Sequence, residues 1–323
     1  MKQVQNFSFR SYAVELQDFK THVAEGFAGN HKQLSPRFFY NERGSELFEQ
    51  ITRLPEYYPT ETEKNILRDH ASELQSELPD TLTIVEPGSG NSEKIEILFE
   101  QISGIRRYVP IEISGEHLRQ RCEKLAERYP QIDFLAIDAD YMDERINREP
   151  IVTENTTPLI FFPGSSLGNY QPEQACEVLR QFRKLAGTPV WMLIGVDLKK
   201  NPAILERAYN DSRGVTAAFN KNMIARMRDE LAMDINPDDF EHQAVYNPDK
   251  GRVEMQLHAR KSMEIFLNGS SYVVDSGEII TTEYSHKYSI DEFHQLASGA
   301  GFKPVRAFCD DQKLFSVHLM KAD

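Results

Sequence analysis

The segment IVEPGSGNSEK, residues 84–94, has the residue types of a loop that binds a nucleotide or a nucleoside. An apolar run leads into two closely spaced glycines, Gly88 and Gly90, and Lys94 lies just beyond them. A Walker A phosphate loop would place a glycine directly before the lysine, where this chain has Glu93. A dinucleotide-binding fingerprint would also need a glycine there, where the pyrophosphate approaches the start of a helix. The segment is therefore a poor phosphate site.

Three acidic residues lie at the ends of three successive apolar runs around this loop. Glu86 ends the first run, Glu112 the second and Asp140 the third. An acid about twenty residues past the glycines is placed to accept both ribose hydroxyls, which suits Glu112. Asp140 could read an adenine amino group with the ring of Tyr141 stacked nearby, and Lys94 could reach a methionine carboxylate. Acids without phosphate partners suit a positively charged nucleoside, and S-adenosylmethionine is such a ligand.

Each of these features alone is more often an ordinary loop residue or a tight turn. Lys94 alone, for example, fits a solvated position on a helix. Their conjunction at neighbouring strand ends favours a cofactor site formed by Glu86, Gly88, Gly90, Lys94, Glu112, Asp140 and Tyr141.

A second loop, FFPGSSLGNY at residues 161–170, contains the Gly-x-Ser-x-Gly pattern of a serine-hydrolase nucleophile elbow around Ser166. An elbow serine should stand at a turn that runs directly into a helix, whereas Pro172 marks a later helix start here. No oxyanion segment of the HGGG type precedes it, so a serine hydrolase that uses Ser166 is a remote alternative. In a methyltransferase the same loop would lie next to the sulfonium, and Asn169 could orient a substrate amine or carboxylate.

The elements that must position these loops alternate between strand and helix from about residue 80. The strands are continuous apolar runs of the kind buried on both faces of a parallel sheet, and they predict a doubly wound α/β core. Strands are expected at 81–87, 107–113, 132–138, 158–164 and 190–197, and helices at 91–102, 114–129 and 172–186. After a helix at 290–301, strands at 302–309 and 313–322 are too close together for a crossover helix, which predicts an antiparallel hairpin at the sheet edge.

The segment from 198 to 286 has a different character and predicts an inserted α+β subdomain. Two helical patterns come first, and short strands joined by the turn sequences NPDKG and NGS follow them. Residues 1–60 precede the alternating core, and the residue pattern alone does not decide where they pack.

Composition and charge favour a globular protein that binds a small molecule. The 323 residues are 40% hydrophobic and 27% charged, and 50 acidic against 37 basic residues give a net charge of -13, which disfavours nucleic acid as a partner. The longest apolar run, residues 190–196, is too short to span a bilayer, and the N-terminus lacks the apolar core of a signal peptide. Three cysteines and nine histidines show no metal-ligand spacing. We expect a cytoplasmic monomer with no metal site and no membrane partner.

Six long strings of the sequence carry a resemblance to a known family. They are LSPRFFYNERGSELFEQITRLPEYYPTETE, EPGSGNSEK, FFPGSSLGNY, RAYNDSRGVTAAFNKN, VEMQLHA and TTEYSHKYS. On these strings, which extend over nearly the whole chain, the protein resembles the histidine-specific Nα-methyltransferases of ergothioneine biosynthesis. The resemblance implies a Rossmann-like class I methyltransferase core of residues 61–197 and 287–323, and a substrate-binding domain of residues 1–60 and 198–286.

The resemblance also implies which residues bind the two ligands. The cofactor set is Tyr40, Gly88, Lys94, Glu112, Asp140 and Tyr141, and the substrate set is Tyr57, Gly164, Asn169, Tyr209, Met255, Glu283 and Ser285. Asn169 and Tyr209 would hold the α-carboxylate of L-histidine. Glu283 and Ser285 would pair with the two imidazole nitrogens, which agrees with strand geometry because residues two apart on a strand point the same way. Without the resemblance, Glu283 and Ser285 would be interpreted as a solvated strand face and Met255 as core.

Two departures from the family pattern are visible. Tyr284 and His286 stand where the family often carries other residues, and Glu112 replaces an aspartate found in some members. Both acids can chelate a ribose diol. Tyr284 and His286 should face away from the pocket, because they alternate with the two residues implied to face into it.

The implied reaction is an in-line displacement in which the sulfonium leaves as a neutral thioether and the amine offers a lone pair. A desolvated site beside the sulfonium charge would lower the pKa of the α-amine, since like charge and low dielectric both disfavour the ammonium. Tyr40 and Tyr57 are the candidate catalytic residues, and with Tyr209 they could offer hydroxyls and aromatic faces that tolerate a quaternary ammonium. Three transfers would give hercynine. The alternative within the fold is an N-methyltransferase for another aromatic amino acid, such as a tryptophan derivative.

Overall fold

The structure is a computed structural model that describes residues 5–12, 16–90 and 93–323. Asn91 and Ser92, which belong to the expected glycine loop and helix, lie outside the described residues. The chain divides into two compact units. The core unit comprises the described parts of 1–14, 59–199 and 288–323, and the second unit comprises those of 15–58 and 200–287.

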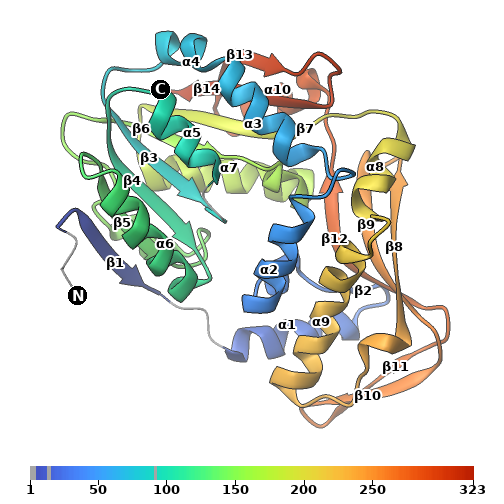
Figure 1. Cartoon of the computed structure of the whole chain (residues 1–323). Helices are drawn as coiled ribbons and strands as arrows, with labels where there is room; N and C mark the ends of the chain where they lie inside the picture. The colour runs from blue at the N-terminus through green and yellow to red at the C-terminus, as the bar shows by residue number, and fades with distance from the viewer. Residues whose placement is uncertain (1–4, 13–15, 91–92) are drawn as a thin grey trace. The chain divides into compact units, whose positions relative to one another are not determined.

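An eight-stranded sheet forms the centre of the core unit, in the order β1-β5-β4-β3-β6-β7-β14-β13 (Figure 1). The strands are β1 (Phe7–Ser11), β5 (Asp133–Asp138), β4 (Ile105–Glu112), β3 (Leu82–Pro87), β6 (Thr157–Phe162), β7 (Val190–Asp197), β14 (Phe315–Ala322) and β13 (Lys303–Cys309). The first six pair in parallel, and β14 pairs antiparallel with both β7 and β13. The doubly wound core and the antiparallel edge hairpin predicted from the sequence are confirmed.

Helices cover both faces of this sheet. Successive residues of a strand point to opposite faces, so neighbours in the chain pack against different helices. Leu159 and Ile160 of β6 are neighbours in the chain, yet they belong to separate hydrophobic clusters. One face packs against α3 (Pro59–Asp69), α4 (Ala71–Glu77), α5 (Glu93–Gln101) and α6 (Gly115–Arg128), and the other against α7 (Pro172–Ala186) and α10 (Ile290–Gly299). Both faces are therefore buried, which explains why the strands are continuous apolar runs.

The first strand differs from the expectation, because residues 7–11 join the core sheet and not the expected substrate-binding domain. β1 pairs in parallel with β5. Phe7 and Phe9 pack against a small cluster that includes Leu118 and Ala136. The strand is five residues long and lies at the sheet edge, so its alternating pattern was too short to predict it.

The second unit contains a four-stranded sheet in the order β2-β12-β9-β8. Its strands are β2 (Lys32–Gln33), β12 (Ile279–His286), β9 (Arg252–Ala259) and β8 (Phe240–Asn247), and a separate hairpin pairs β10 (Met263–Leu267) with β11 (Ser270–Val274). Its helices are α1 (Leu16–Ala28), α2 (Glu42–Ile51), α8 (Pro202–Tyr209), α9 (Val215–Leu231) and the 3-10 turns η1 (Pro36–Phe39) and η4 (Pro237–Asp239). The α+β character predicted for the insertion is confirmed. None of the helices within the described ranges is both long and apolar enough to cross a membrane.

Candidate active site

The glycine loop follows β3 where the strand order of the core sheet reverses, between β3 and β6. Gly88 and Gly90 have φ angles of +67° and +50°, which glycine adopts without the strain that a Cβ would cause. A Cβ at Gly88 would lie 3.6 Å from the ring of Tyr141. The backbone N–H of Gly90 donates to Oε2 of Glu112 at 3.1 Å. The loop thus brings a carboxylate and an aromatic ring together beside bare backbone.

Glu112, the last residue of β4, and Asp140, just beyond β5, are held by backbone amides. Glu112 accepts a second hydrogen bond from the N–H of Ile113 at 2.8 Å. Asp140 accepts from the N–H of Met142 at 2.8 Å, in a turn two residues beyond the strand end at Asp138. The sequence had placed Asp140 at the strand end itself, so its position is corrected. Both carboxylates are oriented by main-chain donors before any ligand binds.

The ring of Tyr141 is fixed by aromatic neighbours. It meets Phe162 and Phe182 edge-on, with ring centroids 6.0 and 5.8 Å apart, and its hydroxyl lies 2.6 Å from that of Tyr170. Burial raises the pKa of Tyr141 well above its usual range, so the phenol stays neutral. Tyr141 therefore offers a rigid flat wall, as the adenine contact predicted from the sequence requires.

Glu86 lies inside the core and accepts a hydrogen bond from the hydroxyl of Tyr108. Its residue surface is 1% exposed, and burial raises the pKa of its carboxyl to about 8. Its described partner is thus a core residue, and a contact between Glu86 and the cofactor stays a prediction.

Two crossed ion pairs join α3 to the start of α5. Lys94 pairs with Glu63, and Lys64 pairs with Glu93. Glu93 is the residue that excludes a dinucleotide fingerprint from the glycine loop. Its carboxylate receives the ammonium of Lys64, which explains why an acid stands at this position.

The second loop forms a left-handed turn and a 3-10 turn, η3 (Ser166–Asn169), before α7 begins at Pro172. Gly164 has a φ of +81°, and its N–H donates to the carboxylate of Glu63. The side-chain amide of Asn169 makes no hydrogen bond within residues 5–12, 16–90 and 93–323, so it is available to a ligand. Gly164 and Asn169 therefore lie in one loop at the carboxyl end of β6, as predicted.

The serine-hydrolase alternative predicts that Ser166 is a reactive nucleophile, and the structure argues against this role. The hydroxyl of Ser166 donates to the carbonyl of Pro163 at 3.1 Å, and a 3-10 turn separates it from α7. The Ser166→Ala variant should keep methyl transfer within about threefold of wild type, because a single surface-loop hydroxyl contributes little here. Labelling by a fluorophosphonate probe, compared between wild type and variant, checks the alternative, and specific labelling of Ser166 would support it.

Within the second unit, a buried lysine links two of the predicted substrate residues. The hydroxyls of Tyr209 and Ser285 lie 2.9 Å apart. Lys287, which is 1% exposed, donates from Nζ to Tyr209 at 3.0 Å and to Ser285 at 2.8 Å. Lysine has donors only, so it occupies an oxygen lone pair of each hydroxyl and polarises both O–H groups, one of which donates to the other hydroxyl.

Glu283 lies on the same strand and is 8% exposed. Its carboxyl makes no hydrogen bond to any other residue that the structure describes. Burial raises the pKa of this carboxyl to about 7, and the charge of Lys287 opposes the rise. Met255, buried on β9, pairs directly with Glu283 in the sheet register. A largely buried carboxyl that the described residues leave without a hydrogen bond is a favourable position for a ligand donor.

The neighbours of these residues on β12 face the other way. Tyr284 stacks on Arg252, whose guanidinium carbon lies 3.5 Å from the ring centroid, and its ring meets that of His286 at 6.4 Å. Tyr284 and His286 thus share one face of β12. This agrees with the alternation predicted from the sequence.

The tyrosines Tyr40 and Tyr57 belong to a row of edge-on rings. Tyr57 meets Tyr209 at 6.1 Å between centroids and Phe48 at 6.4 Å, and Phe48 meets Tyr40 at 5.7 Å. Phe219 of α9 closes the row against Tyr40 at 5.8 Å. Edge-on contacts of this kind hold each ring in one orientation.

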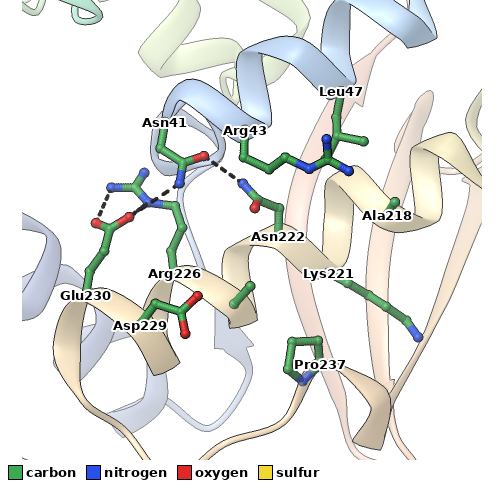
Figure 2. Close-up of a pocket in the computed structure, with 11 residues that line it drawn as sticks. Asn41, Arg43, Leu47, Ala218, Lys221, Asn222, Arg226, Asp229, Glu230 and Pro237 are labelled. Atoms are coloured by element: carbon green, nitrogen blue, oxygen red, sulfur yellow. Dashed lines mark hydrogen bonds and ion pairs between the residues drawn. The ribbon is translucent and has the colours of Figure 1, made fainter.

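A cavity of about 340 Å³ between α2 and α9 is lined by Asn41, the residue that follows Tyr40 in the chain (Figure 2). Asn222 donates to Oδ1 of Asn41 at 2.9 Å (Figure 2). Asn222 also donates to the carbonyl of Phe39 at 3.3 Å, and Arg226 donates to the carbonyl of Phe38. The same Asn41 oxygen caps α2. The polar wall of this cavity therefore fixes the backbone on both sides of Tyr40.

The predicted residues thus form two sets, one in each unit. In the core unit lie Glu86, Gly88, Gly90, Lys94, Glu112, Asp140, Tyr141, Gly164 and Asn169, and in the second unit Tyr40, Tyr57, Tyr209, Met255, Glu283 and Ser285. Sequence reasoning missed Lys287 and Glu63. Lys287 continues the two-residue alternation of Glu283 and Ser285, which could have indicated it. Glu63 gives no local signal, because charged residues are ordinary on a helix.

A doubly wound sheet with a bare Gly-x-Gly turn and acids after successive strands defines the core unit as an S-adenosylmethionine-dependent methyltransferase fold. The model of the histidine-specific, S-adenosylmethionine-dependent methyltransferases matches residues 19–322. The chain belongs to this family.

Three relatives illustrate the range of similar proteins. The chain is 36% identical to a histidine N-alpha-methyltransferase of Mycolicibacterium smegmatis, over 92% of each chain. It is 31% identical to ergothioneine biosynthesis protein 1 of Neurospora crassa, over 96% of this chain and 36% of that longer protein. It is 22% identical to a 4-dimethylallyltryptophan N-methyltransferase of Arthroderma benhamiae, over 88% of each chain.

Proposed function

We propose that this protein transfers methyl groups from S-adenosylmethionine to the α-amine of L-histidine, three times in succession, and so forms hercynine for ergothioneine biosynthesis. The observation that carries the proposal is the buried Glu283, whose carboxyl makes no hydrogen bond to any of the described residues, on the same strand as the polarised hydroxyl of Ser285. A neutral imidazole offers one N–H and one lone pair. Glu283 can accept the first and Ser285 can donate to the second.

The α-carboxylate is assigned to Tyr209 and Asn169. Lys287 places a positive charge next to the hydroxyl of Tyr209, which favours an anion at that hydroxyl. The side-chain amide of Asn169, in the loop after β6, makes no hydrogen bond to the residues that the structure describes. With both ends of histidine bound, the amine between them is held in one orientation.

The core unit offers groups that suit the cofactor. The bare backbone at Gly88 and Gly90 admits a nucleoside closely, Glu112 can accept the ribose hydroxyls, and Tyr141 can cover the adenine. S-adenosylmethionine, when bound, supplies a methyl group on a sulfonium whose leaving group departs neutral, so no acid is required to expel it.

The tyrosines are assigned to the amine. Tyr40 and Tyr57 present aromatic faces and hydroxyls from a fixed row of rings. Such faces stabilise a cation, which suits an amine that gains methyl groups until it is quaternary. Their hydroxyls can pass the amine proton to solvent through water.

Substrate preference tests the proposal against the alternative of a tryptophan derivative. An indole has one N–H and no second lone pair, so it would leave Ser285 or Glu283 unpaired. Formation of S-adenosylhomocysteine should be at least about a hundredfold faster, in kcat/KM, with L-histidine than with L-tryptophan or 4-dimethylallyltryptophan. Equal or greater activity with an indole substrate would contradict the proposed substrate.

The ionisation of Glu283 predicts a pH dependence. The pKa of its carboxyl is about 7 without a ligand, raised from 4.5 by burial, so lowering the pH through 7 protonates it. If the ionised carboxyl accepts the N–H of a neutral imidazole, the Kd for histidine should rise about tenfold more in wild type than in Glu283→Gln between pH 8 and pH 6. The imidazole of free histidine titrates in both proteins and cancels in this comparison. Calorimetric titrations at both pH values check it, and a wild-type affinity that grows at pH 6 would contradict it.

A further inference from the structure

One buried carboxylate with no role in the proposed site connects the two loops of the core unit. Glu63 of α3 is 1% exposed. It pairs with the ammonium of Lys94, and its two oxygens lie 3.1 and 2.8 Å from the backbone nitrogen of Gly164, whose N–H they accept. Lys94 is assigned to the cofactor and Gly164 to the substrate loop. The side chain of Glu63 therefore contacts one residue assigned to the cofactor and one assigned to the substrate loop.

The fold leaves room for this carboxylate at a specific place. Gly195 lies inside β7, and a Cβ at this position would lie 1.9 Å from Oε1 of Glu63. Glycine weakens a strand interior, and the close approach of another group is a usual reason for it. The buried charge is compensated by the ammonium and the backbone N–H, as a charge removed from water requires.

The position of the lysine amine follows from the same contacts. A Cβ at Gly164 would lie 3.4 Å from Nζ of Lys94, so the amine rests against the bare α-carbon of the second loop. Lysine is a flexible side chain with three donors on its ammonium. The ion pair with Glu63 uses one of them and restricts the orientation of the others.

We propose that Glu63 is a positioning residue: it holds the Lys94 ammonium for the methionine carboxylate of the cofactor and, through Gly164, holds the loop that binds the substrate. This inference rests on the proposed function, because it takes the ligands of Lys94 and Gly164 from there. Loss of Glu63 should therefore affect the methionine end of the cofactor and leave its nucleoside end unchanged.

Binding of two cofactor-like ligands tests this role without turnover. Calorimetry would compare S-adenosylhomocysteine with 5′-methylthioadenosine, which lacks the amino-acid end. Glu63→Gln should lower the affinity for S-adenosylhomocysteine about tenfold and change the affinity for 5′-methylthioadenosine by no more than about twofold. Lys94→Met should do the same, and the double variant should be no weaker than Lys94→Met alone. Equal weakening of both ligands, or additive effects in the double variant, would overturn the proposal.

A matched control and a second substitution separate the two contacts. Glu61→Gln removes another α3 carboxylate, one that pairs with Lys64 and is largely exposed, and should change neither affinity. Glu63→Gln keeps an oxygen for the N–H of Gly164, whereas Glu63→Ala does not, so only Glu63→Ala should also raise the KM for histidine several-fold. An unchanged KM in Glu63→Ala would remove the substrate-loop half of the proposal. A protein that shows the binding pattern but methylates no histidine would refute the proposed function and leave the role of Glu63 standing.

Discussion

The Glu283→Ala variant is expected to lose about a hundredfold in kcat/KM for L-histidine. The substitution removes the acceptor for an imidazole N–H, and the bound ring would then bury an unsatisfied donor. Glu283 makes no hydrogen bond to another described residue, so its removal should cost little folding stability. Initial rates at several histidine concentrations, together with a thermal unfolding curve, measure both quantities.

The control for Glu283 is a glutamate outside the site. Glu241 of β8 is exposed, and its ion pair among the described residues, with Arg260, is long at 3.6 Å. Glu241→Ala should keep wild-type activity. If Glu283→Ala keeps kcat/KM within about threefold while folding normally, the imidazole assignment is wrong.

The second large effect is expected at Lys287, which sequence reasoning did not identify. Lys287→Met retains the length of the side chain and removes the charge that polarises Tyr209 and Ser285. We expect the affinity for histidine to fall on the order of thirtyfold and the affinity for S-adenosylhomocysteine to stay unchanged. The free energy of unfolding should fall by about 1–3 kcal/mol, because the substitution removes one partner from the buried hydrogen bonds of Lys287.

This combination distinguishes ligand binding from a structural role. A purely structural lysine would weaken the binding of both ligands together, whereas a lysine of the substrate site would weaken the binding of histidine alone. Calorimetric titration of each ligand into Lys287→Met, with Tyr209→Phe as the companion variant, makes the comparison. Undiminished histidine affinity in Lys287→Met would exclude Lys287 from the substrate site.

The central sheet could be predicted because each of its strands can be recognised from its own run of apolar residues. Runs such as residues 158–164 and 190–197 are apolar throughout, and only strands buried on both faces require that. The final hairpin could be predicted from the short connection between its strands, because the residues between 302–309 and 313–322 are too few for a crossover helix. β1 was missed because its five residues carry too little pattern, and because its partner β5 lies more than a hundred residues away.

The site was predictable in part, and for different reasons in its two parts. Gly88, Gly90 and Glu112 form a local pattern whose chemistry can be deduced from residue types. Glu283 and Ser285 needed the resemblance, because a strand with alternating polar residues is normally solvated.

The contacts that hold these residues could not be predicted. Glu63 and Lys94 are 31 positions apart, and Glu63 and Gly164 are 101 apart. Only the packing of α3 beside α5 and the second loop brings them together. A single sequence does not indicate which charged residues this far apart in the chain form a pair.

The mass of the product formed from L-histidine and S-adenosylmethionine tests the central claim most directly. We predict three successive additions of one methyl group each, ending in a species that gains no more, with fragmentation that places all three on the α-nitrogen. The final species should be a betaine, with a permanent positive charge on its quaternary α-nitrogen. Histidine recovered without added methyl groups, or methylated on the imidazole ring, would contradict the account.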